Sequence, residues 1–294
     1  MNPTGILLID KPGGLTSHDV VARARRALGT RKVGHAGTLD PMATGLLVLG
    51  AGSATRLLTY LVGLGKRYTA TIRLGEATDT DDADGTVTST ADASAVERTA
   101  VDAGVAVLTG EIDQIPSTYS AIKVDGRRSY DRARAGEEVA LAARRVTVSR
   151  FDVLAERRTG SRIDLDVVVE CSSGTYIRAL ARDLGAGLGV GGHLTALRRE
   201  AVGPFEVADA VPADAIDPDA LRSPAAVARA LFPVAELGGD AARDLAHGKR
   251  ITIDVPDAPV VAALAPGERL AGLVAVRDGA ARVLINFPTD EVLP

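Results

Sequence analysis

One aspartate, Asp40, stands in a glycine-rich segment that can present a carboxylate to a substrate. The segment spans residues 34–50 and reads GHAGTLDPMATGLLVLG. Pro41 biases Asp40 toward an extended backbone, and Gly37 and Gly45 permit a tight loop that a substrate can approach closely. A carboxylate presented in this way can act as a nucleophile. An aspartate before proline is also a common turn residue, so Asp40 taken alone does not decide between the two.

Two tyrosines lie close in sequence to arginines. Tyr68 follows Lys66 and Arg67, and Tyr176 lies two residues before Arg178. An aromatic ring together with a guanidinium is the set of groups that holds an unstacked nucleobase. Aromatic residues are scarce, with five Tyr, four Phe and no Trp, so their local context is informative. The alternative for each tyrosine is an amphipathic place at the edge of the core.

The elements around Asp40 are predicted from periodicity and turn signals. We expect a short apolar strand over residues 6–9, followed by a turn. Thr16 and Asp19 have the spacing of a helix capping box, although Asp replaces the usual Glu or Gln, and apolar residues then recur at helical spacing. Residues 46–49 are expected to form a buried strand and residues 53–61 a helix.

The segment that carries Tyr68 alternates between apolar and polar residues as far as Leu74, which predicts a half-buried strand. An acidic loop over residues 76–86 follows. This loop lacks an acid at the first ligand position of a calcium loop and a Glu at the twelfth, so we expect no metal there. The other elements expected here are a helix over 93–108, a mobile basic loop with a short helix over 123–145, a strand over 162–171, a helix over 175–184, and a strand and turn over 193–205.

The pattern changes toward the C-terminus. Residues 209–235 are rich in Pro, Ala and Asp and are expected to form a helical connection. A short helix ending near Gly248 should precede strands over 251–255, 270–276 and 282–287. The predicted fold class is α/β (α+β), with a central mixed, largely antiparallel sheet in a domain over residues 1–235 and a small β-rich domain over residues 236–294.

Length, composition and charge limit the function classes. The chain has 294 residues, one cysteine (Cys171) and a net charge of -4. It has no leader sequence and no apolar run near the ~20 residues that a membrane helix needs, so we expect a cytoplasmic protein without membrane contact. Charge is segregated: residues 1–75 hold ten basic and three acidic residues, residues 76–113 one and ten, and residues 123–150 eight and four. Such segregation produces either a basic face for phosphates or simply solvated surfaces.

Seven motifs in order resemble those of TruB-type pseudouridine synthases, with residues 34–50 matching the catalytic loop. The matches cover roughly residues 5–205. One departure is Ser117, because Pro116-Ser117 replaces the usual double proline. The other six matches are Asp10-Lys11-Pro12-x-Gly14-x-x-Ser17, Lys66-Arg67-Tyr68, Thr78-Asp79-Thr80-x-Asp82-x-Asp84-Gly85, Pro116-x-x-Tyr119-Ser120-Ala121-x-Lys123-x-x-Gly126, Ser173-Gly174-Thr175-Tyr176-Ile177-Arg178 and His193-Leu194-Thr195-x-Leu197-Arg198-Arg199.

The resemblance implies the pseudouridine synthase catalytic fold with a PUA-like C-terminal domain. It also implies that Asp40 is the catalytic residue, and it leaves open attack at C6, attack at C1′ or removal of a ribose proton. Tyr68 is expected to stack on the target base, Tyr176 and Leu197 to line the uracil pocket, and Arg178 to pair with Asp40. His35 is expected to contact RNA near the flipped nucleotide. Lys11 is expected to buttress the loop or meet a phosphate, and Asp82 to hydrogen-bond the substrate.

The activity that the resemblance implies is isomerisation of uridine 55 in the T arm of tRNA. The reaction transfers no external group, so neither a cofactor nor a metal is expected. Extruding the uridine from its stack costs on the order of a few kcal/mol, which stacking on tyrosine offsets. Basic residues within 23–32 and 123–150 are candidates for phosphate contacts. We expect a monomer whose partner is the T-arm stem-loop of tRNA.

Three alternatives remain. A guide-dependent pseudouridine synthase has the same site but normally a larger C-terminal domain and longer terminal extensions. An RNA chaperone that helps tRNA to fold would use catalysis only secondarily. A phosphate-binding NTPase is disfavoured, because no G-x-x-x-x-G-K-[ST] motif is present. The C-terminal residues 236–294 hold nine acidic and six basic residues, which does not favour strong phosphate binding there.

Overall fold

The computed structural model describes residues 3–119, 123–124, 127–128 and 141–287. The chain divides into two compact units. The first unit comprises residues 1–40, 46–62 and 204–294, and the second comprises residues 41–45 and 63–203. The short helix predicted within 123–145 lies largely outside the described residues. In the part of the chain that is described, no helix combines the length and apolar character needed to span a membrane.

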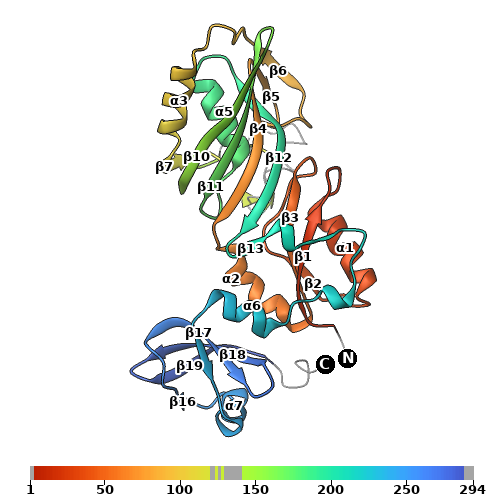
Figure 1. Cartoon of the computed structure of the whole chain (residues 1–294), viewed down its shortest axis with the longest axis vertical. Helices are drawn as coiled ribbons and strands as arrows, with labels where there is room; N and C mark the ends of the chain where they lie inside the picture. Colours follow the sequence, from red (N-terminus) through yellow and green to blue (C-terminus); the bar gives the residue numbers. More distant parts are fainter. Residues whose placement is uncertain (1–2, 120–122, 125–126, 129–140, 288–294) are drawn as a thin grey trace. The chain divides into compact units, whose positions relative to one another are not determined.

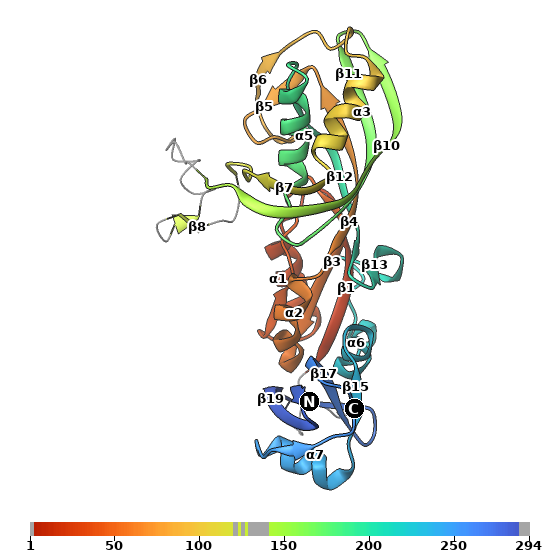
Figure 2. The ribbon, with the colours of Figure 1, turned by 90° about the vertical axis from the view of Figure 1, so that its left-hand side faces the viewer.

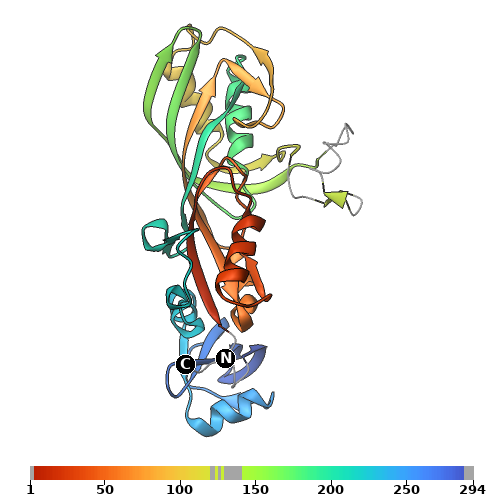
Figure 3. The same ribbon diagram turned by 90° about the vertical axis from the view of Figure 1, so that its right-hand side faces the viewer.

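The first unit begins with a strand, a helix and a hairpin. In chain order these elements are β1 (Gly5–Lys11), α1 (Ser17–Ala27), β2 (Val33–His35), β3 (Thr44–Ala51), the 3₁₀ helix η1 (Gly52–Leu57) and α2 (Leu58–Val62). Strand β1 lies between β3 and the short parallel strand β14 (Val211–Pro212), while β2 pairs antiparallel with β3. Helix α1 lies alongside β1, as the red helix and red strand of Figure 3 show.

The predicted start of α1 is confirmed. Thr16 is the N-cap, and its hydroxyl oxygen accepts a hydrogen bond from Asp19 N at 3.1 Å, while Asp19 Oδ2 accepts one from Thr16 N at 2.8 Å. These two bonds satisfy donors that a helix start otherwise leaves open. The helix predicted over 53–61 is instead a 3₁₀ turn followed by one short α turn. Thr55 Oγ1 donates to Gly52 O at 2.8 Å, a local bond that competes with regular helix geometry.

The second unit is built on an antiparallel sheet. Strands follow one another in the order β12, β4, β11, β10, β7, and all four of these neighbouring pairs are antiparallel. The first residues of β3, Thr44 and Gly45, add a parallel pairing with Arg198 and Arg199 of β12. The strand bounds are β4 (Lys66–Leu74), β5 (Glu76–Thr78), β6 (Val87–Thr90), β7 (Gly110–Gln114), β8 (Lys123–Val124), β9 (Arg127–Arg128), β10 (Arg144–Thr159), β11 (Arg162–Cys171) and β12 (Gly192–Val202).

Two helices cover one face of this sheet. They are α3 (Arg98–Val107) and α5 (Ile177–Gly187), which pack against each other and against the strands (Figure 2). Strand β4 shows the alternation predicted from sequence, with every second residue from Lys66 to Leu74 buried. Strand β4 is paired on both edges, with β11 and with β12, so its backbone is held from both sides. Helix α3 begins at Arg98, five residues later than predicted.

The C-terminal part of the first unit forms a second sheet, in the strand order β15, β17, β18, β19, β16 (Figure 1). Its core is built mainly from Val, Ala, Leu and Ile, and it confirms the predicted β-rich C-terminal region. In chain order, the elements from residue 205 onward are β13 (Phe205–Glu206), η2 (Val207–Asp209), η3 (Pro218–Ala220), α6 (Pro224–Leu231), β15 (Val234–Glu236), α7 (Gly239–Ala246), β16 (Ile251–Thr252), β17 (Ala258–Ala265), β18 (Arg269–Arg277) and β19 (Ala280–Asn286).

Two details of this region differ from the prediction. Strand β17 was not predicted, since it is rich in alanine, which has low strand propensity. Strand β16 ends at Thr252 rather than at Val255, just before a segment that contains Asp254 and Pro256, residues that are depleted in strands. The fold class is nonetheless as predicted, a mixed and largely antiparallel sheet with a small β-rich C-terminal part. The domain boundary at residue 235 stays a prediction.

A buried lysine begins β4. Lys66 is 9% exposed, and its ammonium donates a hydrogen bond to Leu64 O at 2.7 Å. Burial, assisted by the positive charge of Arg199, lowers the pKa of Lys66 to about 8. Cys171 lies opposite Lys66 in the sheet, and burial raises the pKa of its thiol to about 11. The fold therefore opposes charge on both side chains.

Replacing Lys66 by Met should change how stability depends on pH. The folded-state pKa of Lys66, about 8, lies below its usual 10.5, so between these values the unfolded chain binds more protons than the folded one. Stability from this group therefore rises with pH across that window. We expect the free energy of unfolding of the wild type, relative to Lys66→Met, to increase by up to about 3 kcal/mol from pH 7.5 to 10.5. Urea unfolding at several pH values measures this difference.

The exposed Lys32 provides the control. Lys32→Met removes one positive charge without changing a buried site. A pH-dependent difference of the same size in Lys32→Met would show that burial of Lys66 is not its cause.

Candidate active site

The loop that carries Asp40 is held at both ends by backbone hydrogen bonds. Strands β2 and β3 pair from Val33↔Ala51 to His35↔Leu49, and Ala36 N donates to Val48 O at 2.9 Å. The loop then leaves the hairpin through Gly37, whose φ of 99° requires glycine. Asp40 follows in a half-buried position.

Ser17 fixes the peptide that precedes Asp40. Its hydroxyl oxygen accepts a hydrogen bond from Leu39 N at 2.9 Å and donates one to Leu39 O at 3.1 Å. Both residues are buried, with Ser17 1% and Leu39 4% exposed. One side chain thus satisfies both backbone groups of Leu39, which restricts the direction in which the chain enters Asp40. Sequence reasoning included Ser17 in a motif but gave it no role.

Lys11 supports the turn between β1 and α1. Its side chain is completely buried, and Nζ donates to Leu15 O at 2.7 Å and to Pro12 O at 3.0 Å. Leu15 lies just before α1 and Ser17, so these bonds hold the turn that leads into α1, and the predicted buttressing of the Asp40 loop stays a prediction. His35 stands edge to face with His18, with ring centroids 5.7 Å apart. The contacts of Lys11 and His35 with RNA stay predictions.

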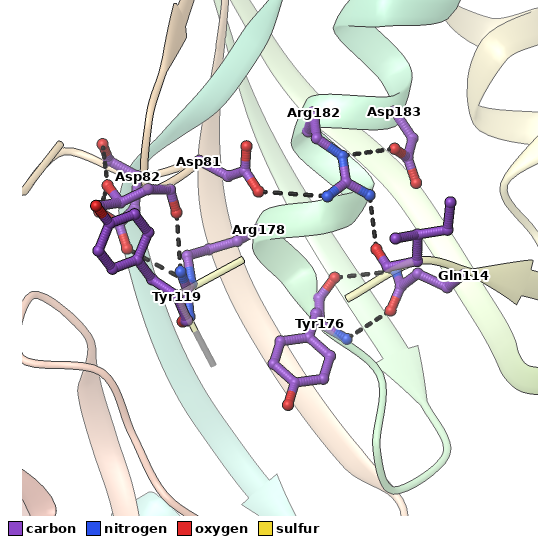
Figure 4. A network of polar contacts seen from close by, with 10 residues as sticks. Asp81, Asp82, Gln114, Tyr119, Tyr176, Arg178, Arg182 and Asp183 are labelled. Carbon is purple, nitrogen blue, oxygen red and sulfur yellow. Dashed lines mark hydrogen bonds and ion pairs between the residues drawn. The ribbon is translucent and has the colours of Figure 1, made fainter. Parts of the chain in front are cut away.

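In the second unit the guanidinium of Arg178 joins three segments. Arg178 is 4% exposed and lies in the first turn of α5. Its Nη1 donates to Thr80 O at 2.8 Å and its Nη2 to Tyr119 O at 2.7 Å, while Nε lies 3.5 Å from Asp82 Oδ2 (Figure 4). Arg178 therefore connects α5 to the acidic loop and to the segment that ends at Tyr119.

Asp82 is engaged within its own loop. Its Oδ1 accepts hydrogen bonds from Thr80 Oγ1 at 2.6 Å and from Asp84 N at 3.1 Å, and its carbonyl accepts one from Thr78 Oγ1 at 2.9 Å. It is only 4% exposed. The structure thus shows Asp82 as a loop-forming residue that also pairs with Arg178, whereas its predicted bond to substrate stays a prediction.

Tyr68 and Leu197 share one face of the sheet. Leu197 of β12 lies directly opposite Ala70 of β4, and Tyr68 stands two residues before Ala70. Residues opposite each other in an antiparallel pair project to the same side, as do residues two apart along a strand. Arg199, opposite Tyr68 and 1% exposed, belongs to the same face. The stacking predicted for Tyr68 and the pocket predicted for Tyr176 and Leu197 stay predictions.

Tyr176 is the N-cap of α5, and its backbone is held by Gln114. Gln114 Oε1 accepts from Tyr176 N at 2.8 Å, and Gln114 Nε2 donates to Tyr176 O at 3.0 Å (Figure 4). Gln114 is 2% exposed. Nothing in the sequence pointed to Gln114, because its partners are backbone atoms 62 residues away.

The predicted residues fall into two groups. Lys11, His35 and Asp40 belong to the first unit, and the other predicted site residues belong to the second. In the second unit the structure brings Arg178 into contact with Asp82. The predicted pairing of Arg178 with Asp40 stays a prediction. No cluster of three or more His, Cys, Asp or Glu side chains suited to a metal occurs among the described residues.

The sequence matches three family descriptions along its length. They are "TruB family pseudouridylate synthase (N terminal domain)" over residues 25–177, "tRNA pseudouridylate synthase B C-terminal domain" over residues 178–234 and "tRNA Pseudouridine synthase II, C terminal" over residues 232–288. Curated relatives agree. The tRNA pseudouridine synthase B of Leifsonia xyli subsp. xyli (strain CTCB07) is 58% identical over 296 residues and that of Arthrobacter sp. (strain FB24) 55% over 300 residues, each match covering 98% of both chains.

A solved structure shows the same fold. The chain is similar to one chain in the crystal structure of a Cbf5-Nop10-Gar1 complex, with a TM-score of 0.72 and 25% sequence identity, and the match covers 97% of this chain and 86% of that one. The curated relatives match over nearly their full lengths, and their names agree with the family that the seven motifs resemble. The chain therefore belongs to the TruB family and is a tRNA pseudouridine synthase, an enzyme that isomerises uridine to pseudouridine in tRNA.

Proposed function

We propose that the enzyme acts on uridine 55 in the T arm of tRNA, with Asp40 as the catalytic carboxylate and without a cofactor. The observation that carries this proposal is the clamp that Ser17 makes on Leu39, which fixes the chain immediately before Asp40. A carboxylate on a fixed backbone is prepared for attack at one position, and this preparation lowers the entropy cost of reaction.

The atom balance of the reaction supports the absence of a cofactor. The C1′–N1 glycosidic bond breaks, the uracil turns, and a C1′–C5 bond forms. The C5 proton is released to solvent and N1 gains one, so nothing is oxidised or reduced. Asp40 begins this exchange, by attack at C6, by attack at C1′, or by removal of a ribose proton.

The remaining predicted residues hold the extruded nucleotide in this proposal. Tyr68 stacks on the uracil, and Tyr176 and Leu197 line its pocket, which offsets the energy of unstacking. Arg178 orients and stabilises the Asp40 carboxylate, since an adjacent cation favours the ionised form. His35, Lys11 and Asp82 contact or support the RNA around the target.

Basic residues supply the electrostatic attraction to tRNA. Exposed side chains at the end of α1 include Arg26, Arg31 and Lys32. Arg145 and Arg150 of β10 are less available, because they pair with Glu111 and Glu170 respectively. We propose that the monomeric enzyme meets its tRNA in the cytoplasm through the first set and the basic loop after Tyr119.

Replacing Asp40 by Asn is the direct test of this function. Wild type should release tritium from tRNA labelled with [5-³H]uridine, stoichiometric with one T-loop uridine. Asp40→Asn should bind the same tRNA but release none, because the amide is neither a nucleophile nor a base. Asp92→Asn is the matched control, since Asp92 is exposed and accepts a turn hydrogen bond from Ser94 N at 2.8 Å.

Each outcome has a definite meaning. Tritium release by wild type and by Asp92→Asn, with none from Asp40→Asn, supports the proposal. Substantial turnover by purified Asp40→Asn would reject the role of Asp40. Tight tRNA binding without release by the wild type would favour the chaperone alternative, and release from a uridine outside the T arm would reject the proposed position.

Replacing Ser17 by Ala should reduce catalysis more than a change of similar cost in stability at another helix of the first unit. Loss of the hydroxyl leaves both buried backbone groups of Leu39 without this partner, at a cost of about 1–3 kcal/mol. The single-turnover rate should fall by about 10- to 100-fold, because Asp40 loses its fixed entry. Ser223→Ala, which removes the N-cap hydroxyl of α6 that accepts from Ala226 N at 3.1 Å, costs about 1 kcal/mol and should keep the rate. Equal rates in the two variants would contradict the positioning role.

Neutralising the basic loop should weaken tRNA binding and its dependence on salt. The change is Arg127, Arg128, Arg132 and Arg134 to Gln. Of these, Arg132 and Arg134 lie outside the described residues. Each lost phosphate contact should reduce the slope of log K against log [salt] by up to about one. The control neutralises Arg98 and Arg157, which pair with Asp102 and Asp166. If the slope is the same as that of the wild type, the basic loop is not part of the surface that binds tRNA.

A further inference from the structure

Two arginines one helical turn apart on α5 join the same two segments of the chain. Arg178 contacts Thr80 and Asp82 on one side and Tyr119 on the other. Arg182 repeats this pattern, with Nη1 3.4 Å from Asp81 Oδ2 and Nη2 donating to Ile115 O at 2.7 Å (Figure 4). We call the contacts of Arg182 with Asp81 and Ile115 the outer bridge, and those of Arg178 the inner bridge.

The outer bridge holds a residue with an uncommon backbone. Asp81 has φ of 61°, a left-handed conformation that residues with a side chain seldom adopt. Its backbone is fixed from both sides, because its N–H donates to Thr78 O at 3.3 Å and its carbonyl accepts from Leu194 N at 3.1 Å. Such a conformation persists where the surroundings determine it, and it concentrates at functional sites.

The carboxylate of Asp81 depends on its neighbours. Burial raises its pKa, and the Ser117 hydroxyl, Arg182 and Arg178 counteract this effect, in that order, whereas Asp183 adds to it. Arg182 also lies 2.9 Å from Asp183 Oδ1, so one guanidinium balances two carboxylates. Removal of Arg182 would leave the Asp81 carboxylate, whose side chain is 13% exposed, with less compensation, and such a group moves or becomes protonated.

The segment from Ile115 to Tyr119 has an anchor at each end. The outer bridge holds the carbonyl of Ile115, and the inner bridge holds that of Tyr119. Between them Pro116 and Ser117 are buried. Gln114, just before the segment, holds the backbone of Tyr176. A shift of this segment would therefore displace acceptors of Arg178 and the residue that holds Tyr176.

The position of Arg178 also depends on Arg182 through the acidic loop. Asp81 is the residue directly before Asp82, and Asp82 is the carboxylate partner of Arg178. Without the outer bridge, the strained backbone at Asp81 loses one of the contacts that maintain it. Asp82 would then shift, and with it the guanidinium of Arg178. Arg182 thus reaches Arg178 by two routes, through Asp81 on one side and through Ile115 on the other.

We propose that Arg182 is a positioning residue for the isomerisation, acting on Arg178 and Tyr176 through the outer bridge. This inference rests on the proposed function, in which Arg178 and Tyr176 serve the reacting nucleotide. Arg182 itself is not a phosphate contact, because its guanidinium is engaged by Asp81, Asp183 and Ile115. Its loss therefore slows the chemical step and leaves tRNA affinity nearly unchanged.

The test compares single-turnover rate with tRNA affinity. The variants are Arg182→Gln, Arg182→Lys, Asp81→Asn and the double variant Arg182→Gln/Asp81→Asn. Asp81→Asn suits the site because asparagine tolerates positive φ, so it removes the charge without adding backbone strain. Arg98→Gln on α3 is the control, since it breaks an exposed (i, i+4) ion pair with Asp102 in the same unit. Tritium release from [5-³H]uridine-labelled tRNA gives the rate, and filter binding gives Kd.

If the outer bridge acts as one unit, the variants should differ from the wild type in rate and not in affinity. Arg182→Gln should slow release by about 10- to 100-fold, with Kd and circular dichroism like those of the wild type. Arg182→Lys should recover part of the rate, because one ammonium can reach Asp81 or Ile115 but does not span both. The double variant should be no slower than the slower single variant, since either change breaks the same connection.

Other outcomes overturn the inference. If Arg182→Gln releases tritium as fast as Arg98→Gln, Arg182 is not a positioning residue. The proposed function is unaffected by that result. Weaker tRNA binding with an unchanged rate at saturation makes Arg182 a binding residue instead. If Arg182→Gln does not fold, Asp81→Asn decides, and a wild-type rate in that variant rejects the outer bridge. No release by the wild type itself rejects the proposed function and this inference together.

Discussion

The burial of one guanidinium, that of Arg178, constrains much of the second unit. Arginine stays charged, so a side chain that is 4% exposed must find partners for its donors within the protein. Those partners are backbone carbonyls of Thr80 and Tyr119 and the carboxylate of Asp82. The acidic loop and the segment before residue 120 are consequently tied to α5. The need to satisfy this buried charge adds to the backbone bonds that hold the acidic loop, such as the one from Leu194 N to Asp81 O at 3.1 Å.

The loop of Asp40 is constrained by a smaller group in the first unit. Ser17 lies in the first turn of α1, whose start is set by the reciprocal bonds of Thr16 and Asp19. The capping box therefore fixes the helix, the helix fixes Ser17, and Ser17 fixes Leu39. Lys11 adds a second support, since it holds the turn that delivers the chain to α1. The local sequence around α1 therefore determines, through these hydrogen bonds, the position of Leu39, the residue before Asp40.

Sequence predicted what depends on local order. The alternation along β4, the capping box of α1 and the strand 162–171 were all confirmed. What the sequence did not reveal depends on contacts between distant residues. Gln114 and Arg182 use backbone acceptors, and any residue type supplies a carbonyl, so no pattern marks their partners. Charge counting also misled in part, because Arg145 and Arg150, counted as basic surface, are paired with acids. For the predicted site, the motifs supplied residue types, and the network that positions them came only from the structure.

The short strand β7 has a consequence for how the protein behaves at high concentration. Among the described strands it ends the order of its sheet, paired only with β10, and such an edge is a template on which another chain can add. Its outward residues Glu111 and Asp113 alternate with less exposed ones, and both pair with Arg145 of the neighbouring strand. A second molecule approaching this edge would have to bury those carboxylates. The charged side chains therefore protect this edge against aggregation.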